Sequence, residues 1–166
     1  MKKRILSMFC SIAILCTMLA GVANAQTIDS DLRCVDGSYL TEEDSSTGTS
    51  LPKGAKGEYL ATGACTISKA GLTRIYAYAS TTANRVVNYM QTIVYVEQYD
   101  EEADAWGQVY SWKAEDFNDY YMSTDAAVVV EPGYYYRVHA IHIAGDQYPY
   151  DETFSVTDGI FVPPLP

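Results

Sequence analysis

The sequence has few basic residues, few histidines and few cysteines for its length. Its 166 residues include 11 Lys and Arg against 21 Asp and Glu, so the net charge at pH 7 is −10. Nucleic acids and anionic membranes are bound by basic surfaces, so we expect neither as a partner. A hydrophobic fraction of 48% with 19% charged residues is typical of a folded globular chain.

Only one long apolar run occurs, and it lies at the N-terminus. Ile5–Ala20 carries no charge, follows the basic start Met1–Arg4 and precedes Ala23–Ala25, a small-x-small cleavage pattern. A transmembrane helix needs about 20 apolar residues, whereas this run breaks at Gly21. We therefore predict a signal peptide over residues 1–25 and a secreted protein without a stable membrane anchor after cleavage.

Cleavage would remove two of the four cysteines and leave Cys34 and Cys65. An even pair of cysteines in an exported chain indicates a disulfide bond. Two thiolates are too few for a zinc site of the usual kind. We expect a disulfide between Cys34 and Cys65, and the alternative is two unpaired thiols.

The two histidines, His139 and His142, do not predict a metal site. On a strand, residues three apart point to opposite faces, so the two imidazoles would be separated. We expect His139 to face solvent and His142 to be buried or at an edge. The sequence predicts no metal and no cofactor.

Acidic residues alternate at Asp100, Glu102 and Asp104, as in calcium-binding loops. An EF-hand would need glycine at the sixth position and glutamate at the twelfth, where this chain has Ala105 and Ser111. An EF-hand is excluded, and whether the loop Asp100–Asp104 binds calcium in another way stays open.

Helical periodicity is nearly absent, and period-two alternation predicts an all-β fold. Residues 26–57 are polar and turn-rich, so we expect a flexible N-terminal arm, loosest over Glu42–Gly57, before a domain at 58–166. We expect a loop at Thr81–Arg85 and a short helix at Lys113–Asp119. The predicted strands are Glu58–Ser68, Leu72–Ser80, Val86–Tyr99, Trp106–Trp112, Tyr120–Val130, Tyr134–Ala144 and Thr153–Val162.

Val128–His142 (VVVEPGYYYRVHAIH) resembles the corner between strands E and F of fibronectin type III modules. Val94–Trp106 is similar to their strand C, the following loop and strand C′. The resemblance implies a seven-stranded immunoglobulin-like β-sandwich. It also implies that Tyr136 is the corner tyrosine, whose hydroxyl bonds back to the backbone. The residues that it places toward the core are Val130, Pro132, Tyr136, Val138 and Ala140.

A second resemblance joins Lys69–Ala83 (KAGLTRIYAYASTTA) with Gly133–Ile143 (GYYYRVHAIHI), behind a signal peptide. This combination is similar to a family of small, uncharacterised secreted proteins of Gram-positive bacteria. The family implies no activity, cofactor or catalytic residue.

Tyrosine is abundant, with 15 residues in the chain, all after the predicted signal peptide. Tyr76 and Tyr78 share one face of their strand, and Tyr135 shares a face with Arg137 and His139. Exposed tyrosines give large, rigid contact areas at low entropic cost. These five residues are our candidate interaction surface.

We therefore expect a secreted, non-catalytic binding module for an extracellular protein or glycan. The alternative is a small secreted hydrolase or toxin-like effector with a site that the sequence does not reveal. No serine lies in a Gly-x-Ser-x-Gly turn, and the acidic residues cluster in loops where carboxylates are well solvated.

Overall fold

Strands dominate the computed structural model, which describes residues 32–50 and 58–166. The predicted signal peptide and residues 26–31 and 51–57 of the predicted arm lie outside the described residues. No helix in the described part is long and apolar enough to cross a membrane. The strands are β1 Cys34–Val35, β2 Ser38–Thr41, β3 Ser45–Ser50, β4 Leu60–Gly71, β5 Arg74–Val87, β6 Tyr89–Asp100, β7 Ala105–Asp116, β8 Asp119–Val129, β9 Tyr134–Gly145, β10 Asp151–Val156 and β11 Gly159–Val162.

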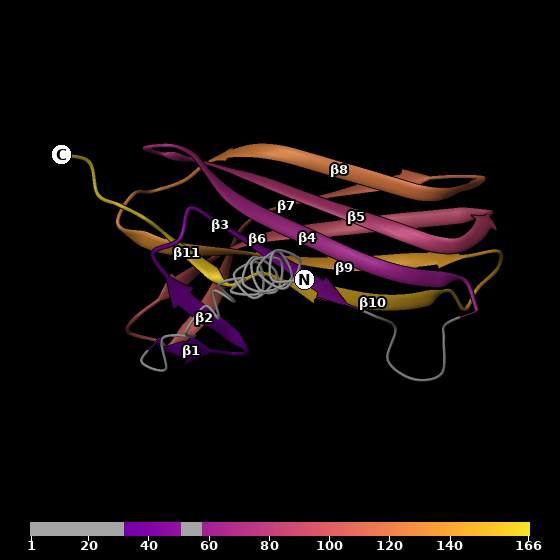
Figure 1. Cartoon of the computed structure of the whole chain (residues 1–166), viewed down its shortest axis with the longest axis horizontal. Helices are drawn as coiled ribbons and strands as arrows, with labels where there is room; N and C mark the ends of the chain where they lie inside the picture. The colour runs from indigo at the N-terminus through magenta and orange to yellow at the C-terminus, as the bar shows by residue number, and fades with distance from the viewer. Residues whose placement is uncertain (1–31, 51–57) are drawn as a thin grey trace, which may run out of the picture. The chain divides into compact units, whose positions relative to one another are not determined.

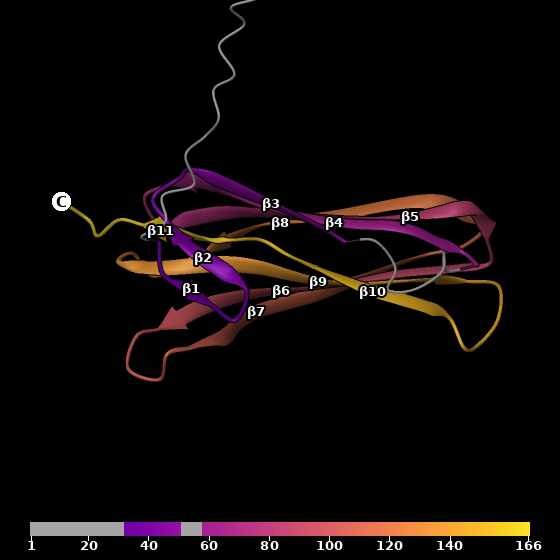
Figure 2. The same ribbon diagram turned by 60° about the horizontal axis from the view of Figure 1, so that its bottom comes forward.

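These strands form two sheets, which lie as two layers in Figures 1 and 2. The smaller sheet has the order β3-β4-β5-β8. The larger sheet has the order β1-β2-β11-β9-β6-β7, and β10 pairs with β9 as well. All pairings are antiparallel except that of β2 with β11, which is parallel. The prediction of an all-β fold with sandwich-like packing of two sheets is confirmed.

Two predicted breaks in the strands are wrong. The expected loop Thr81–Arg85 belongs to β5, and its Thr81 and Ala83 point inward and are buried. The expected helix at Lys113–Asp119 is mostly a continuation of β7 as far as Asp116, with Ala114 packed against the core. In both segments the side chains alternate between the two faces of the strand. Pairing with the neighbouring strands stabilises the extended backbone and outweighs the low strand propensity of the local sequence.

The described part of the predicted arm is also paired backbone. β1 and β2 form a hairpin, and β3 pairs with β4 from Ser45 opposite Ser68 to Ser50 opposite Gly63. The expectation of a loose loop is therefore wrong for β3. Its small side chains allow close packing: a Cβ on Gly48 would lie 1.8 Å from the Val156 carbonyl oxygen.

The main core lies between the sheets and is built by alternating residues. Ile75, Ala77 and Ala79 of β5 face inward from the smaller sheet, and Val94 and Val96 of β6 do so from the larger one. From β9, the buried residues Tyr136, Val138 and Ala140 complete the same cluster, as the sequence predicted. The Tyr136 hydroxyl donates a hydrogen bond to the Glu131 carbonyl oxygen at 2.7 Å, which is the contact expected of a corner tyrosine.

Two substitutions at Tyr136 separate the contribution of its ring from that of its hydroxyl. We expect Tyr136→Ala to lower the free energy of unfolding by about 3–5 kcal/mol, because it deletes a buried aromatic ring. Tyr136→Phe should cost only about 1 kcal/mol, the usual net value of one hydrogen bond. Urea unfolding measures both, with Tyr135→Ala on the opposite face of β9 as the control. A larger loss for Tyr135→Ala would contradict the facing of β9.

Candidate functional site

The predicted interaction surface is divided between two sides of the molecule. Tyr76 and Tyr78 lie on the outer face of the smaller sheet, on β5. Tyr135, Arg137 and His139 lie on the outer face of the larger sheet, on β9. Because the inner faces of β5 and β9 share one core, these two groups point in opposite directions. The structure therefore does not bring these five residues together in one surface.

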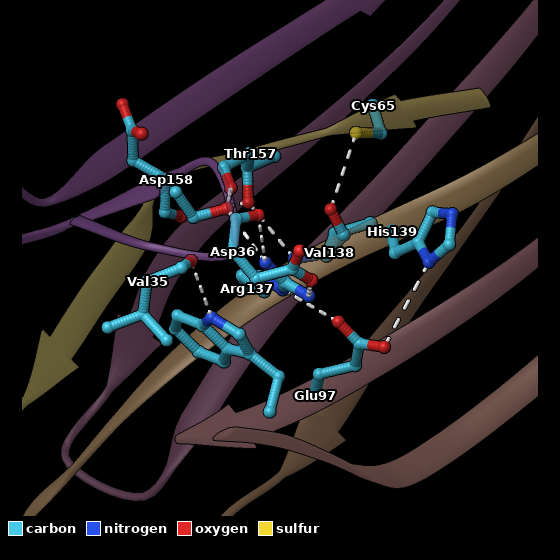
Figure 3. A network of polar contacts seen from close by, with 11 residues as sticks. Val35, Asp36, Cys65, Glu97, Arg137, Val138, His139, Thr157 and Asp158 are labelled. Atoms are coloured by element: carbon cyan, nitrogen blue, oxygen red, sulfur yellow. Dashed lines mark hydrogen bonds and ion pairs between the residues drawn. The ribbon is translucent and has the colours of Figure 1, made fainter. Parts of the chain in front are cut away.

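Arg137 is a buried structural residue with an exposure of only 4%. Its Nε donates to Glu97 Oε2 at 2.6 Å, and its guanidinium lies 4.5 Å from the centre of the Trp106 ring. It also bonds Asp36 Oδ2 at 3.2 Å and Ser38 Oγ at 3.0 Å (Figure 3). Asp36 lies in the β1–β2 turn and Ser38 begins β2, so Arg137 holds the β1–β2 hairpin against the outer face of β9 and β6.

Glu97 connects this network to His139. Its Oε1 lies 3.9 Å from His139 Nδ1, and its other oxygen accepts from Arg137. Burial alone would raise the pKa of Glu97, but the interactions with His139 and Arg137 outweigh burial and lower this pKa. Glu97 therefore stays ionised and is committed to partners within the protein.

The β1–β2 hairpin also covers the outer face of the larger sheet near the start of β9. Tyr135 packs against Phe161 at 4.9 Å between ring centres and against a small cluster built around Tyr99. That cluster contains Val35 and Leu40 of the β1–β2 hairpin. The hairpin thus buries much of the surface where the sequence placed an interaction site.

His142 lies in a buried polar network inside the sandwich, with its side chain on the opposite face of β9 from His139, as predicted. Its Nδ1 lies 2.9 Å from Thr81 Oγ1, and its Nε2 lies 2.8 Å from Ser155 Oγ. A Cβ on Gly63 would meet the imidazole at 2.1 Å, so glycine is required there. Ser155 and His142 resemble a nucleophile and base by distance alone. Their exposures of 2% and 0% leave no room for a substrate.

The two cysteines are free thiols, so the predicted disulfide is wrong. Cys65 on β4 points into the core with an exposure of 0%, and its Sγ contacts the Val138 carbonyl oxygen at 3.6 Å. Cys34 on β1 is exposed. Burial raises the pKa of Cys65 to about 11, which keeps this thiol protonated and unreactive. The β1–β2 hairpin is held by strand pairing and by the contacts of Arg137, and not by a covalent bond.

In the acidic loop Asp100–Asp104, carboxylates accept hydrogen bonds from donors within the protein. Asp100 Oδ1 accepts from the backbone N–H groups of Glu102 and Ala103, at 2.9 and 3.1 Å. Asp104 Oδ1 accepts from the Tyr99 hydroxyl at 2.9 Å and from Arg33 at 3.0 Å. Within residues 32–50 and 58–166, no three His, Cys, Asp or Glu side chains are arranged to hold a metal ion.

The outer face of the smaller sheet is different, because it is open and carries many hydroxyl groups. Register pairing aligns its outward residues in cross-strand rows, and none of these residues is buried. We call this surface the hydroxyl face. Its rows are Ser45-Ser68-Tyr76-Ala127, Thr47-Thr66-Tyr78-Asp125, Thr49-Ala64-Ser80-Ser123 and Thr62-Thr82-Tyr121.

Neighbouring side chains on the hydroxyl face bond to each other. The hydroxyls of Tyr78 and Tyr121 lie 2.8 Å apart, and those of Thr47 and Thr66 lie 3.0 Å apart. The hydrogen bond between the tyrosines lowers the pKa of Tyr78 and raises that of Tyr121. Sequence reasoning found Tyr76 and Tyr78 but missed Tyr121 and the serine and threonine rows. Period-two Ser and Thr in residues 45–50, 62–68 and 80–82 was the available signal.

No protein-family model, curated protein or solved structure matches the chain.

The buried His142 predicts a defined loss of stability in acid. Burial lowers the pKa of His142 to about 4, from an ordinary value of 6.5. Below pH 6.5 the unfolded chain takes up a proton that the folded chain refuses, so acid favours unfolding. The free energy of unfolding should therefore fall by up to about 3 kcal/mol between pH 6.5 and 4, with no contribution above this range.

Urea unfolding between pH 7.5 and 4.5 measures this loss. His142→Gln should flatten the slope whatever its effect at pH 7.5, whereas His139→Gln on the opposite face of β9 should leave it in place. An unchanged slope in His142→Gln would contradict the assignment.

Proposed function

We propose that the protein is a secreted, non-catalytic binding module that holds a neutral glycan on its hydroxyl face. The hydrogen bond between Tyr78 and Tyr121, which spans the row of Ser80 and Ser123, is the observation that carries the proposal. Secretion is supported by the basic, apolar and small-residue segments of residues 1–25.

The strand order supports a fibronectin type III-like form of the sandwich. β4, β5 and β8 share one sheet, as strands A, B and E do in such modules. β7, β6, β9 and β10 adjoin one another in the other sheet, as expected for C′, C, F and G. The Tyr136 contact at the start of β9 supports the same assignment. Because this fold hosts many functions, only the chemistry of the surface indicates the ligand.

Charge supports a neutral ligand. The four rows of the hydroxyl face contain one charged side chain, Asp125, although the chain as a whole carries −10. A strongly basic or acidic polymer would find little electrostatic complementarity there.

Hydroxyl chemistry and exposed rings support a sugar. Serine, threonine and tyrosine hydroxyls both donate and accept hydrogen bonds, which matches the hydroxyls of a glycan. Tyr76 and Tyr121, with exposures of 37% and 42%, offer rings on which a sugar can stack. The strand spacing of about 4.8 Å repeats these groups in two dimensions, which suits an extended polysaccharide better than a compact ligand.

Retention on polysaccharides tests the proposal. We expect the protein to be retained by at least one neutral polymer among cellulose, chitin and mixed-linkage β-glucan, and not by heparin or polygalacturonate. Tyr76→Ala combined with Tyr121→Ala should weaken retention at least tenfold, which corresponds to about 1.4 kcal/mol.

Tyr39→Ala is the matched control, because Tyr39 is similarly exposed, at 43%, but lies on β2 in the larger sheet. Equal losses for Tyr39→Ala and the double variant would contradict the proposal, as would retention by anionic polymers alone.

A further inference from the structure

A groove lies at one end of the sandwich, away from the hydroxyl face. A hollow of about 710 Å³ is bordered by the β6–β7 loop and by Pro132, Gly133 and Tyr134 at the start of β9. A smaller hollow of about 260 Å³ adjoins it between β7 and the end of β8. Gln98 and Val109 line both hollows, so the two form one continuous depression, which we call the end groove.

A β-bulge places Val109 at the centre of the end groove. The pairing of β6 with β7 shifts between Val96, opposite Tyr110, and Glu97, opposite Gln108, so Val109 has no direct partner. Bulges redirect side chains and are frequent beside functional sites. Here the bulge exposes an apolar side chain, at 49%, where the two hollows meet.

Exposed apolar side chains gather around this position. Tyr110 and Tyr134 line the end groove, with exposures of 45% and 43%. Together with Val109, they give the groove apolar and aromatic surface beside its polar lining, which suits an interaction with a peptide.

Two open strand edges border the end groove. In the described part of the chain, β7 pairs only with β6, and β8 pairs only with β5. The outer side of each strand therefore presents backbone N–H and C=O groups without a sheet partner. Extended peptides bind such edges by adding a strand, and neighbouring pockets receive alternate side chains.

The negative charge of the larger hollow favours a basic peptide. Asp100, Glu101 and Glu102 line it, and no Lys or Arg is among its lining residues. A basic segment would meet complementary charge there, whereas an acidic one would be repelled.

We propose that the end groove binds an extended basic peptide of alternating apolar and cationic residues, which adds a strand to the β7 edge. Its apolar side chains pack on Val109 and Tyr110, and its cationic side chains face the β6–β7 loop. This site is separate from the hydroxyl face and would make the protein a connector between a glycan and a basic protein segment.

Three labelled eight-residue peptides, measured by fluorescence anisotropy, test the proposal. Lys-Val repeated four times is the probe, Glu-Val repeats reverse its charge, and Lys-Ser repeats remove its apolar side chains. We expect the Lys-Val peptide to bind at least tenfold more tightly than either of the others. Equal binding of the Lys-Val and Lys-Ser peptides would overturn the proposal, because net charge alone would then explain it.

Matched variants locate the site. Val109→Ser should weaken Lys-Val binding at least fivefold, whereas Val86→Ser should leave it unchanged, because Val86 is a similarly exposed valine, at 59%, on β5. Glu101→Gln with Glu102→Gln should weaken binding and reduce its salt dependence, while Glu152→Gln on β10 should not. Equal effects of Val86→Ser and Val109→Ser would contradict the site.

Sedimentation equilibrium of the same proteins tests whether a second copy of this chain occupies the groove instead of a peptide. We expect a monomer for both the wild type and Val109→Ser. A dimer that Val109→Ser dissociates would overturn the proposal, because the groove would then be occupied by a second copy of this chain.

Discussion

The buried guanidinium of Arg137 is the interaction on which the arrangement of surfaces depends. A charge with 4% exposure is stable only when ionic and hydrogen-bonding partners surround it. Glu97 supplies the carboxylate on the adjacent strand, and Asp36 and Ser38 supply further acceptors from the β1–β2 turn. Satisfying this one charge therefore requires the β1–β2 hairpin to lie against the larger sheet, where Trp106 covers the guanidinium.

The two outer faces of the sandwich differ as a result. The hairpin covers Tyr99 and packs beside Tyr135, so one end of the larger sheet is occupied by the protein's own residues. The smaller sheet has no such cover over its hydroxyl face in the described residues. The end groove lies where the first residues of edge strand β7 approach the last residues of edge strand β8. Binding to a glycan and binding to a peptide would therefore use separate surfaces.

The alternation of apolar and polar residues predicted the features that depend on neighbouring residues in the sequence, above all which face of a strand each side chain occupies. Alternation along residues 134–144 gave the correct facing of Tyr136, His139 and His142, because side-chain direction in a strand has a period of two. β3 was missed because SSTGTS has no apolar residue, and the close approach of Gly48 to Val156 of β10 is not visible in the local sequence. Arg137 was assigned to the surface because its partner Asp36 lies 101 positions away. Cysteine count predicted a disulfide, but only the fold shows that Cys65 faces the core.

Chemical-shift mapping with a soluble oligosaccharide of the retained glycan is the most direct test of the central claim, that the hydroxyl face is the binding surface. Amide resonances of the ¹⁵N-labelled protein would be followed during titration. We expect shifts concentrated in β4, β5 and β8, around Tyr76, Tyr78 and Tyr121, with little change near Arg137. Shifts concentrated on the outer face of the larger sheet, around Tyr95 and His139, would contradict it.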